Sequence, residues 1–249
     1  MQPLRAVPGD GLKSLMQRVA ERKAWEDANP ELAAAWNEAA LEDEARRVAR
    51  IRAAETAARA QEVRAGAPRR LERLGCPPRA VALWDSGKAK PTVASAALER
   101  METERKCLAL LTGDTGVGKT SAAVAFLARE VLKDERDDLP VLFVRATECA
   151  RMGLYDADDK NLAGQMRTAT ALVIDDLGAE FMSEGSIWRT ILDEVIDTRY
   201  GEGLATVLTT NLTTDAFKAR YGERIADRIR HAGVVEACGT GSMRARGEG

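Results

Sequence analysis

Histidine, cysteine and aromatic residues are scarce in this sequence, and their scarcity excludes several kinds of site. One histidine, His231, and four separated cysteines occur among 249 residues, and aromatic residues make up 4%. A Ser-His-Asp or Cys-His centre would have to use this one imidazole, and no CxxC pair is present to bind zinc. Scattered cysteines are typical of a reducing compartment, so we expect free thiols. We expect His231 to be a surface residue or a cation at a helix C-terminus.

Long apolar runs and one-sided charge are also absent. No apolar run approaches the roughly 20 residues that a membrane-spanning helix needs, and the opening MQPLRAVPGD lacks the apolar centre of a signal peptide. We therefore expect a cytoplasmic protein that makes no membrane contact. Residues 1–106 carry 20 Lys and Arg against 16 Asp and Glu, and residues 107–249 carry 17 against 23. Neither half is a basic arm, so bulk charge says nothing for or against nucleic acid binding.

The N-terminal quarter of the chain favours helix. An apolar residue recurs with helical spacing from about Leu12, and Asn29-Pro30-Glu31 is typical of a helix start, with the Asn side chain as the cap. The sequence from there to about Ala65 is rich in Ala, Arg and Glu, and Gly66-Ala67-Pro68 predicts the helix end. The apolar face of this second helix is thin. Two interpretations stay open, a solvated helix or helical hairpin and a module that docks a partner.

Changes in composition and in hydrophobic pattern divide the chain into three expected regions. Residues 1–66 form a helical, partner-binding region, residues 67–106 a linker or strap dense in Gly and Pro, and residues 107–249 a nucleotide-binding domain. In the third region short β-rich runs alternate with helical stretches, which favours an α/β fold with a parallel sheet covered on both faces. The strand candidates are residues 107–111, 141–144, 171–174 and 206–209.

A glycine-rich motif follows the first strand candidate. GDTGVGKT, residues 113–120, matches G-x-x-x-x-G-K-[ST] at every fixed position. The glycines let successive amides point at phosphate oxygens at a helix N-terminus, Lys119 reaches the terminal phosphates, and the Thr120 hydroxyl ligates Mg²⁺. The motif therefore predicts a P-loop that binds ATP with Mg²⁺. The residues expected to contact the nucleotide are Gly113, Asp114, Thr115, Gly116, Val117, Gly118, Lys119, Thr120 and Ser121.

An acidic pair ends the third strand candidate. In ALVIDD, Asp175 follows an apolar strand and its carboxylate should emerge beside the P-loop, where it would hold Mg²⁺ with Thr120. Asp176 is then placed to polarise the attacking water or to bind the metal through a water. The alternative, a turn that merely ends a strand, is weakened because the two motifs support each other.

Two further motifs are weaker signals. Asn211, in LTTNL at the end of the fourth strand candidate, has an amide that could position a water, although such clusters also end strands through turn chemistry alone. In GERIADRIR, Arg224 and Arg228 are four residues apart and share a helix face. This face is either a solvated basic surface or the carrier of an arginine that reaches the phosphates bound by a neighbouring subunit.

Taken together, GDTGVGKT, LVIDDLGAE, the Arg199-Tyr200 pair, TVLTTNL, GERIADRIR and a late GSMR resemble the AAA+ ATPases of the DnaC/DnaI helicase-loader and IstB transposition-helper group. The resemblance covers about Arg73 to Arg246 and includes GCPPR before the nucleotide domain. It implies a P-loop ATPase core that assembles side by side into a spiral or ring, with ATP between subunits. Its implied partners are a replicative DNA helicase and single-stranded DNA.

The resemblance also assigns roles to residues. Asp175 is the magnesium acid, Asp176 stands at the usual catalytic glutamate position, and Asn211 is sensor 1. Arg228 is the finger that acts in trans, with Arg224 as second choice, and Arg244 corresponds to sensor 2. Because Asp176 is one methylene shorter than glutamate, we expect slow or partner-stimulated hydrolysis, with Glu180 as a possible substitute.

The family also places single-stranded DNA contacts in two segments, here about residues 147–165 and 178–186. They contain Arg151, Tyr155, Lys160, Phe181 and Ser183, a set suited to backbone contact and stacking. The first segment also holds three aspartates that phosphates would repel.

Several functions stay open from sequence alone. The preferred one is an ATP-dependent helicase loader, and the second is an IstB-like helper of DNA transposition. A P-loop kinase for small molecules is a third interpretation, against which we find no arginine-rich lid segment. A nucleotide-gated adaptor without meaningful hydrolysis is the fourth.

Overall fold

The computed structural model describes residues 11–133, 140–151, 157–181 and 187–239, and the chain divides into two compact units, Met1–Ala58 and Arg59–Gly249. Helix α1 spans Gly11–Ala28 and α2 spans Pro30–Arg73, so α2 runs from the first unit into the second. None of the helices in the described part of the chain has both the length and the apolar character needed to cross a membrane.

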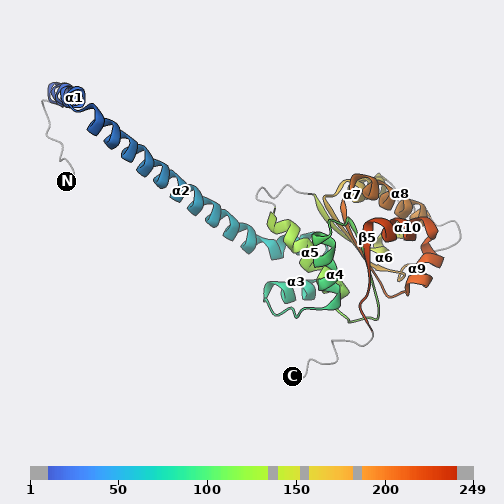
Figure 1. Ribbon diagram of the computed structural model, residues 1–249. Helices are drawn as coiled ribbons and strands as arrows, with labels where there is room; N and C mark the ends of the chain where they lie inside the picture. The colour runs from blue at the N-terminus through green and yellow to red at the C-terminus, as the bar shows by residue number, and fades with distance from the viewer. Residues whose placement is uncertain (1–10, 134–139, 152–156, 182–186, 240–249) are drawn as a thin grey trace. The chain divides into compact units, whose positions relative to one another are not determined.

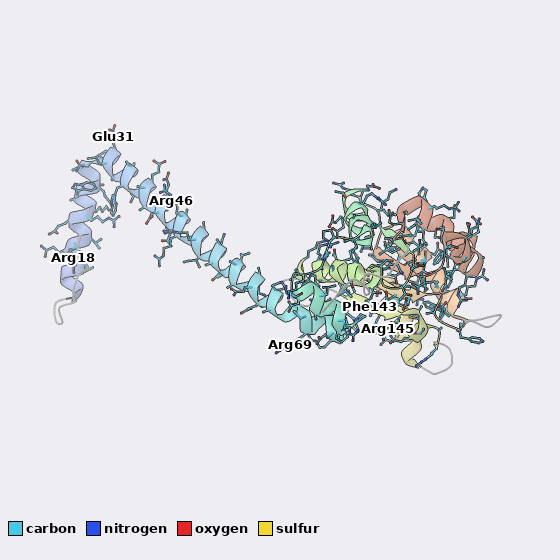
Figure 2. The ribbon with its side chains drawn as sticks, turned by 90° about the horizontal axis from the view of Figure 1, so that it is seen from below. Arg18, Glu31, Arg46, Arg69, Phe143 and Arg145 are labelled. Atoms are coloured by element: carbon cyan, nitrogen blue, oxygen red, sulfur yellow. The ribbon has the colours of Figure 1, made fainter. Side chains whose placement is uncertain are left out.

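The first unit consists of α1 and most of α2, and its side chains are largely exposed. Asn29 separates the two helices, but the capping differs from our expectation. Its side-chain amide donates to the Trp25 carbonyl at 3.0 Å and so closes the end of α1, while its own carbonyl accepts from the Ala33 amide at 2.9 Å. Figure 2 shows side chains along the first half of α2, Glu31 and Arg46 among them, projecting outward from the helix.

The predicted end of α2 at Gly66-Ala67-Pro68 is wrong, because the helix continues through Pro68 to Arg73. A proline inside a helix costs about 3 kcal/mol or more, so packing must offset that cost. Ala67 and Leu71 are buried in the core of the second unit. Local propensity is therefore overridden by the burial of the last turns.

The second unit is a parallel sheet between two layers of helices (Figure 1). Its strand order is β2-β3-β4-β1-β5, and every neighbouring pair is parallel. The strands are β1 (Leu108–Thr112), β2 (Val141–Arg145), β3 (Ala171–Leu177), β4 (Ala205–Thr210) and β5 (Gly233–Ala237). Four of them match the strand candidates within a few residues. The predicted α/β class with a parallel sheet flanked by helices is confirmed.

Helices cover both faces of this sheet. The remaining helices are α3 (Pro78–Asp85), α4 (Val93–Thr103), α5 (Lys119–Lys133), α6 (Ala146–Cys149), α7 (Ala157–Thr168), α8 (Ile187–Glu202), α9 (Thr214–Tyr221) and α10 (Glu223–Ala232). Side chains of β1 alternate between two cores. Ala109 and Leu111 join the core under α3, α4 and α5, whereas Leu108 and Leu110 join the core under α8, α9 and α10. This is the pattern of a sheet buried on both sides.

Residues 67–106, predicted as a linker or strap, contribute α3, α4 and the last turns of α2 to the core beside α5. Thr92 begins α4 with a reciprocal capping box, in which its hydroxyl accepts from the Ser95 amide at 3.0 Å and the Ser95 hydroxyl accepts from the Thr92 amide at 2.8 Å. The segment therefore packs as part of the second unit. Its separate functional role stays a prediction.

A fully buried arginine lies at the amino-terminal ends of the central strands β3 and β4. The Arg199 guanidinium donates to the Thr206 hydroxyl at 2.7 Å and to the carbonyls of Ala169 and Ala205 at 2.6 and 2.7 Å. Burial lowers the pKa of Arg199 to about 10. Sequence reasoning noticed Arg199 only as part of a family motif, and its role here is to join α8 to the start of β4 and the end of α7.

Candidate nucleotide site

The glycine-rich motif forms the turn between β1 and α5, as predicted. Gly113, Gly116 and Gly118 have φ of 129°, 89° and 96°, a region that side chains other than glycine rarely adopt. Close approach adds a second requirement at two of them. A Cβ on Gly113 would lie 2.8 Å from the Gly239 carbonyl oxygen, and one on Gly118 would lie 3.1 Å from the Thr92 methyl group. The loop therefore packs closely between Thr92, the N-cap residue of α4, and Gly239, which follows β5.

The remaining residues of the motif occupy this loop and the first turn of α5. Asp114 and Thr115 are exposed, and the Val117 side chain is buried in the core. Lys119, Thr120 and Ser121 begin α5. All nine residues that we expected to contact the nucleotide therefore lie in one continuous turn at the N-terminus of a helix, where amides and the helix dipole favour an anion.

The Lys119 amino group lies across the loop. This side chain is only 5% exposed, and its Nζ donates to the carbonyls of Gly113 and Asp114 at 2.7 and 2.9 Å and to Asn211 Oδ1 at 2.9 Å. Burial lowers the pKa of Lys119 from its ordinary value, and nearby acidic groups oppose that shift. Through this contact the ends of β1 and β4 bring together Lys119 and Asn211, two of the residues predicted for the site.

Asp175 faces the glycine-rich loop, and its carboxylate accepts hydrogen bonds from two hydroxyl groups. Its Oδ1 accepts from the Thr120 hydroxyl at 2.9 Å and from the Thr209 hydroxyl at 2.7 Å. The side chain is 4% exposed and, within the described residues, has no ion-pair partner. Burial raises the pKa of Asp175 above its ordinary value, against the lowering effect of the two hydroxyls.

A divalent cation fits these groups. A buried carboxylate with no ion-pair partner among the described residues, 2.9 Å from a hydroxyl, supplies oxygen ligands of the kind that Mg²⁺ takes together with phosphate oxygens. No group of three or more His, Cys, Asp and Glu side chains suited to a metal occurs in the described residues. The predicted Mg²⁺ ligands are therefore Thr120 and Asp175, with phosphate and water as the other ligands.

Asp176 lies at an irregular point of β3. Pairing with β4 shifts register between Ile174 and Leu177, and Asp176 has φ of 61°, in the left-handed region. Its amide donates to the Thr209 hydroxyl at 2.9 Å. The shift lets Asp175 point into the site while Asp176 stays exposed beside it. Non-glycine residues held in this region cluster at functional sites.

Thr209 is the residue of this site that sequence reasoning missed. Its hydroxyl links Asp175 and Asp176 by donating to the carboxylate of one and accepting from the amide of the other. A signal was present, since Thr209 is a polar residue inside a buried strand and lies two residues before Asn211 in LTTNL. Only the β3–β4 register, however, reveals that its hydroxyl reaches Asp175.

Arg224 and Arg228 contact acids of their own chain. Both arginines pair with Asp193 and Asp197 of α8, Arg224 at 3.1 and 3.0 Å and Arg228 at 3.4 Å from Asp193 and closer to Asp197. The side chain of Arg228 is 15% exposed and that of Arg224 is 63% exposed. Neither forms a hydrogen bond or ion pair with the P-loop, Asp175 or Asn211 in the described part of the chain. The structure does not bring them to the site of the same chain.

Other predicted residues are distributed as follows. Arg244 lies outside the described residues, as do Tyr155, Ser183 and the side chain of Lys160. Phe181 is 89% exposed, directly after the turn that leaves β3. His231 lies in the last turn of α10, and its Nδ1 is 2.9 Å from the Tyr200 hydroxyl.

Glu180, which we considered as a substitute for Asp176, is buried. Its carboxylate accepts hydrogen bonds from Tyr221, Arg220 and the Gly178 amide. Because these groups occupy the Glu180 carboxylate, we assign the role of orienting the attacking water to Asp176 in the proposal below.

Comparisons with known proteins agree with these motifs. A family model described as IstB-like ATP binding protein matches residues 81–248, more than half of the chain. No curated protein matches the chain.

Three solved structures illustrate the similarity of this chain to known folds. The crystal structure of DnaI is 25% identical, covering 58% of this chain and 82% of that chain, with a TM-score of 0.47. The DnaC helicase loader is 21% identical over 60% of this chain and 92% of that one, with a TM-score of 0.45. A DNA replication initiation factor is 17% identical over 59% of this chain with a TM-score of 0.47, and the match spans only 44% of that chain.

Proposed function

The chain belongs to the family of IstB-like ATP-binding proteins, and from that premise we propose that it is an ATPase that loads a replicative DNA helicase onto single-stranded DNA. ATP binding would favour the state that holds helicase and DNA, and hydrolysis would release them. The activity is proposed for the cytoplasm.

The observation that supports the proposed ATPase activity is that residues from the carboxyl ends of three strands lie together. Lys119 after β1, Asp175 in β3 and Asn211 after β4 are joined by direct hydrogen bonds or through Thr120 and Thr209. Ligands of parallel α/β sheets bind at the carboxyl ends of the strands. This arrangement supports the binding of a triphosphate over the loop.

In the proposed reaction each side chain has one task. Loop amides and Lys119 bind the phosphates, and Thr120 and Asp175 hold Mg²⁺, which supplies positive charge against the phosphate oxygens. Asp176 orients the attacking water and Asn211 fixes it against the terminal phosphate. Because an aspartate reaches less far than a glutamate, turnover by the isolated chain should be slow.

A second copy of the chain would complete the site. We propose that Arg228, or Arg224 as second choice, leaves its aspartate partners on assembly and reaches the phosphates held by its neighbour. An arginine supplied in this way is worth about 10³ to 10⁵ in rate. Arg244, at the late GSMR, is proposed as a further phosphate contact.

The first unit is the proposed contact with the helicase. Among its large apolar side chains, Leu32, Trp36 and Leu41 are 62%, 56% and 72% exposed. Exposed apolar residues are ordinary when they are scattered singly, but here they recur along the part of α2 in the first unit, where Ala33 is the one buried residue among the described side chains. This supports the docking interpretation over that of a solvated helix.

The experiment that tests the proposal measures particle mass. The full chain is mixed with Mg-ATP and a single-stranded oligonucleotide, alone and with the replicative helicase of the same organism, and each mixture is weighed by light scattering after gel filtration. We expect a nucleotide-dependent assembly and a joint complex with helicase. If the helicase elutes free with and without nucleotide, the loader function is wrong.

A transposition helper is the second candidate, and the family match to an IstB-like protein favours it. Such a helper would bind duplex DNA and a transposase instead of a helicase. The same experiment with duplex and single-stranded oligonucleotides of equal length separates the two functions. Preference for the duplex would reverse our ranking.

A further inference from the structure

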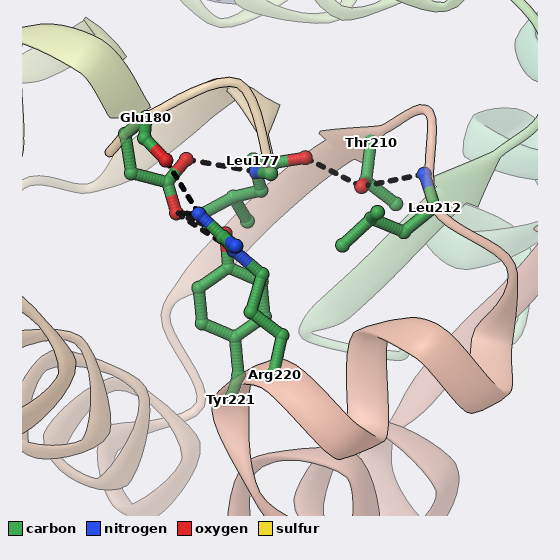
Figure 3. Close-up of polar contacts among 7 residues, drawn as sticks. Leu177, Glu180, Thr210, Leu212, Arg220 and Tyr221 are labelled. Carbon is green, nitrogen blue, oxygen red and sulfur yellow. Dashed lines mark hydrogen bonds and ion pairs between the residues drawn. The ribbon is translucent and has the colours of Figure 1, made fainter. Parts of the chain in front are cut away.

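A buried carboxylate lies next to the site and has no role in the proposed chemistry. The side chain of Glu180 is 0% exposed, and carboxylates are almost never fully buried unless paired. Its Oε1 accepts from the Tyr221 hydroxyl at 2.5 Å and from two guanidinium nitrogens of Arg220 at 3.3 Å, and its Oε2 accepts from the Gly178 amide at 2.8 Å (Figure 3). We call Glu180, Arg220 and Tyr221 the turn clamp.

The turn clamp joins the end of α9 to the turn that leaves β3. Arg220 donates to the Glu180 carbonyl at 2.5 Å as well as to the carboxylate, so it fixes both backbone and side chain. The turn itself is closed by the Ala179 amide, which donates to the Asp176 carbonyl at 3.1 Å. Asp176 therefore begins the turn and Glu180 directly follows it.

The same turn rests on the residues after β4. A Cβ on Gly178 would lie 2.8 Å from Leu212 Cγ, so the two segments are in close contact. The Thr210 hydroxyl donates to the Leu177 carbonyl at 2.5 Å and accepts from the Leu212 amide at 3.1 Å (Figure 3). Asn211 lies between Thr210 and Leu212. The contacts that place the turn therefore also place the backbone on both sides of Asn211.

We propose that Glu180, Arg220 and Tyr221 are positioning residues for ATP hydrolysis, holding the turn so that Asp176 and Asn211 face the terminal phosphate together. Asp176 has a left-handed backbone, and such conformations persist only where surrounding contacts over-determine them. Thr209 fixes the Asp176 amide from one side, and the turn clamp fixes the following residues from the other.

Stability alone does not account for the turn clamp. A buried ion pair is often no more stabilising than apolar side chains of similar volume. A carboxylate that accepts four hydrogen bonds in fixed directions does, however, define the turn geometry more narrowly than apolar packing would. Loss of one clamp contact is therefore expected to displace Asp176 and Asn211 while the fold is retained.

This inference rests on the proposed ATPase function, and it predicts a distinctive kinetic signature. Lys119 and the loop amides bind the phosphates and form no hydrogen bond with the turn clamp in the described residues. ATP affinity should therefore be retained when the clamp is weakened, whereas turnover should fall. A purely structural role would instead lower the folded fraction and reduce both quantities together.

The test compares Glu180→Gln and Tyr221→Phe with the wild-type full chain, and measures the dissociation constant of Mg-ATP and the turnover at saturating ATP. Tyr221→Phe removes one hydroxyl and keeps a ring that packs against Phe217, 4.8 Å between centroids, so it tests the proposal even if Glu180→Gln fails to fold. We expect turnover to fall about 10- to 100-fold in both variants. The dissociation constant should stay within about twofold of wild type.

Glu202→Gln, which changes an exposed acid at the end of α8, is the matched control and should keep wild-type turnover. Wild-type turnover in Tyr221→Phe would overturn the positioning role, as would equal losses of affinity and turnover. Lys119→Ala serves as the inactive reference. A wild-type chain with no turnover above that reference would refute the proposed function, and the inference with it.

Discussion

The two ends of α2 have opposite environments although they belong to one helix. Leu41 is 72% exposed in the first unit, whereas Leu71 is fully buried in the second. Among the described side chains of residues 16–58, Ala33 is the one that is buried. In the second unit even charged groups such as Lys119, Asp175 and Glu180 are buried and hydrogen-bonded. The second unit is thus determined by its own packing, whereas most described side chains of the first are exposed and, in our proposal, available to a partner.

The largest expected effect is on ATP turnover. It comes from Arg228, a residue of the second unit that we propose to act on the nucleotide bound by another copy of the chain. Arg228→Ala should lower turnover about 10³-fold or more, because the neighbour's phosphates lose a cation. Turnover is measured across a range of protein concentrations. Mixing Arg228→Ala with Lys119→Ala should restore part of the activity, since each supplies what the other lacks.

Arg230→Ala is the control for this prediction, because Arg230 lies on the same helix, is half exposed and pairs with Glu223. It should behave as wild type. Full turnover by Arg228→Ala would show that this arginine is bound to α8 for structural reasons alone, and attention would move to Arg224.

The next prediction concerns the free energy of unfolding and compares the exposed and buried parts of α2 directly. Leu71→Ala should lower the free energy of unfolding by about 2–5 kcal/mol, because it leaves a cavity in the core. Leu41→Ala should change it by no more than about 0.5 kcal/mol. Both values come from urea unfolding followed by circular dichroism. Similar losses in the two variants would mean that the first half of α2 is buried in solution, for example by a second copy.

A smaller effect is expected at the buried acid of the site. Since burial raises the pKa of Asp175, the native state binds its proton more tightly than the unfolded chain, and stability falls as pH rises from the ordinary carboxyl value through the raised one. Asp175→Asn should therefore stabilise the nucleotide-free protein at neutral pH by on the order of 1 kcal/mol. Thermal unfolding across that pH range measures the difference between the variants. Destabilisation at neutral pH would contradict the electrostatic argument.

The smallest expected effect on the chain itself is at Trp36. Its ring lies 4.8 Å from the Arg22 guanidinium, a cation–π contact worth about 0.5–1 kcal/mol at an exposed site. Trp36→Ala should leave the free energy of unfolding and the ATP turnover nearly unchanged but weaken helicase binding about tenfold or more, as loss of an aromatic anchor does. Unchanged helicase affinity would argue that α2 is only a solvated helix.

Motifs in the sequence were enough to predict which segments meet at the candidate nucleotide site, because the P-loop spacing and the strand-ending acids depend on local structure. They were not enough for contacts made by distant residues. Thr209 reaches Asp175 only through the register of β3 and β4, and the Asp193 and Asp197 partners of Arg228 depend on α8 packing against α10. Pro68 misled the prediction for the opposite reason, since tertiary burial outweighs its local preference.

Strand β5 was missed altogether. It consists of Gly233–Ala237, a short run with a glycine at its start and a glutamate near its end, so its composition is not typical of a strand. Its pairing with β1 compensates for that composition. A Cβ on Gly233 would lie 2.9 Å from the Leu108 carbonyl, so only glycine allows the strands to approach at this point.

Titration of the full chain with Mg-ATP by calorimetry tests the central claim, that the turn after β1 and the acid of β3 bind a triphosphate together. We predict saturable binding by the wild-type chain and its loss in Lys119→Ala, with both proteins equally folded by circular dichroism. A folded wild-type chain that shows no binding heat and binds no fluorescent ATP analogue would contradict the account. Equal binding of Mg-ATP by Lys119→Ala would contradict it as well.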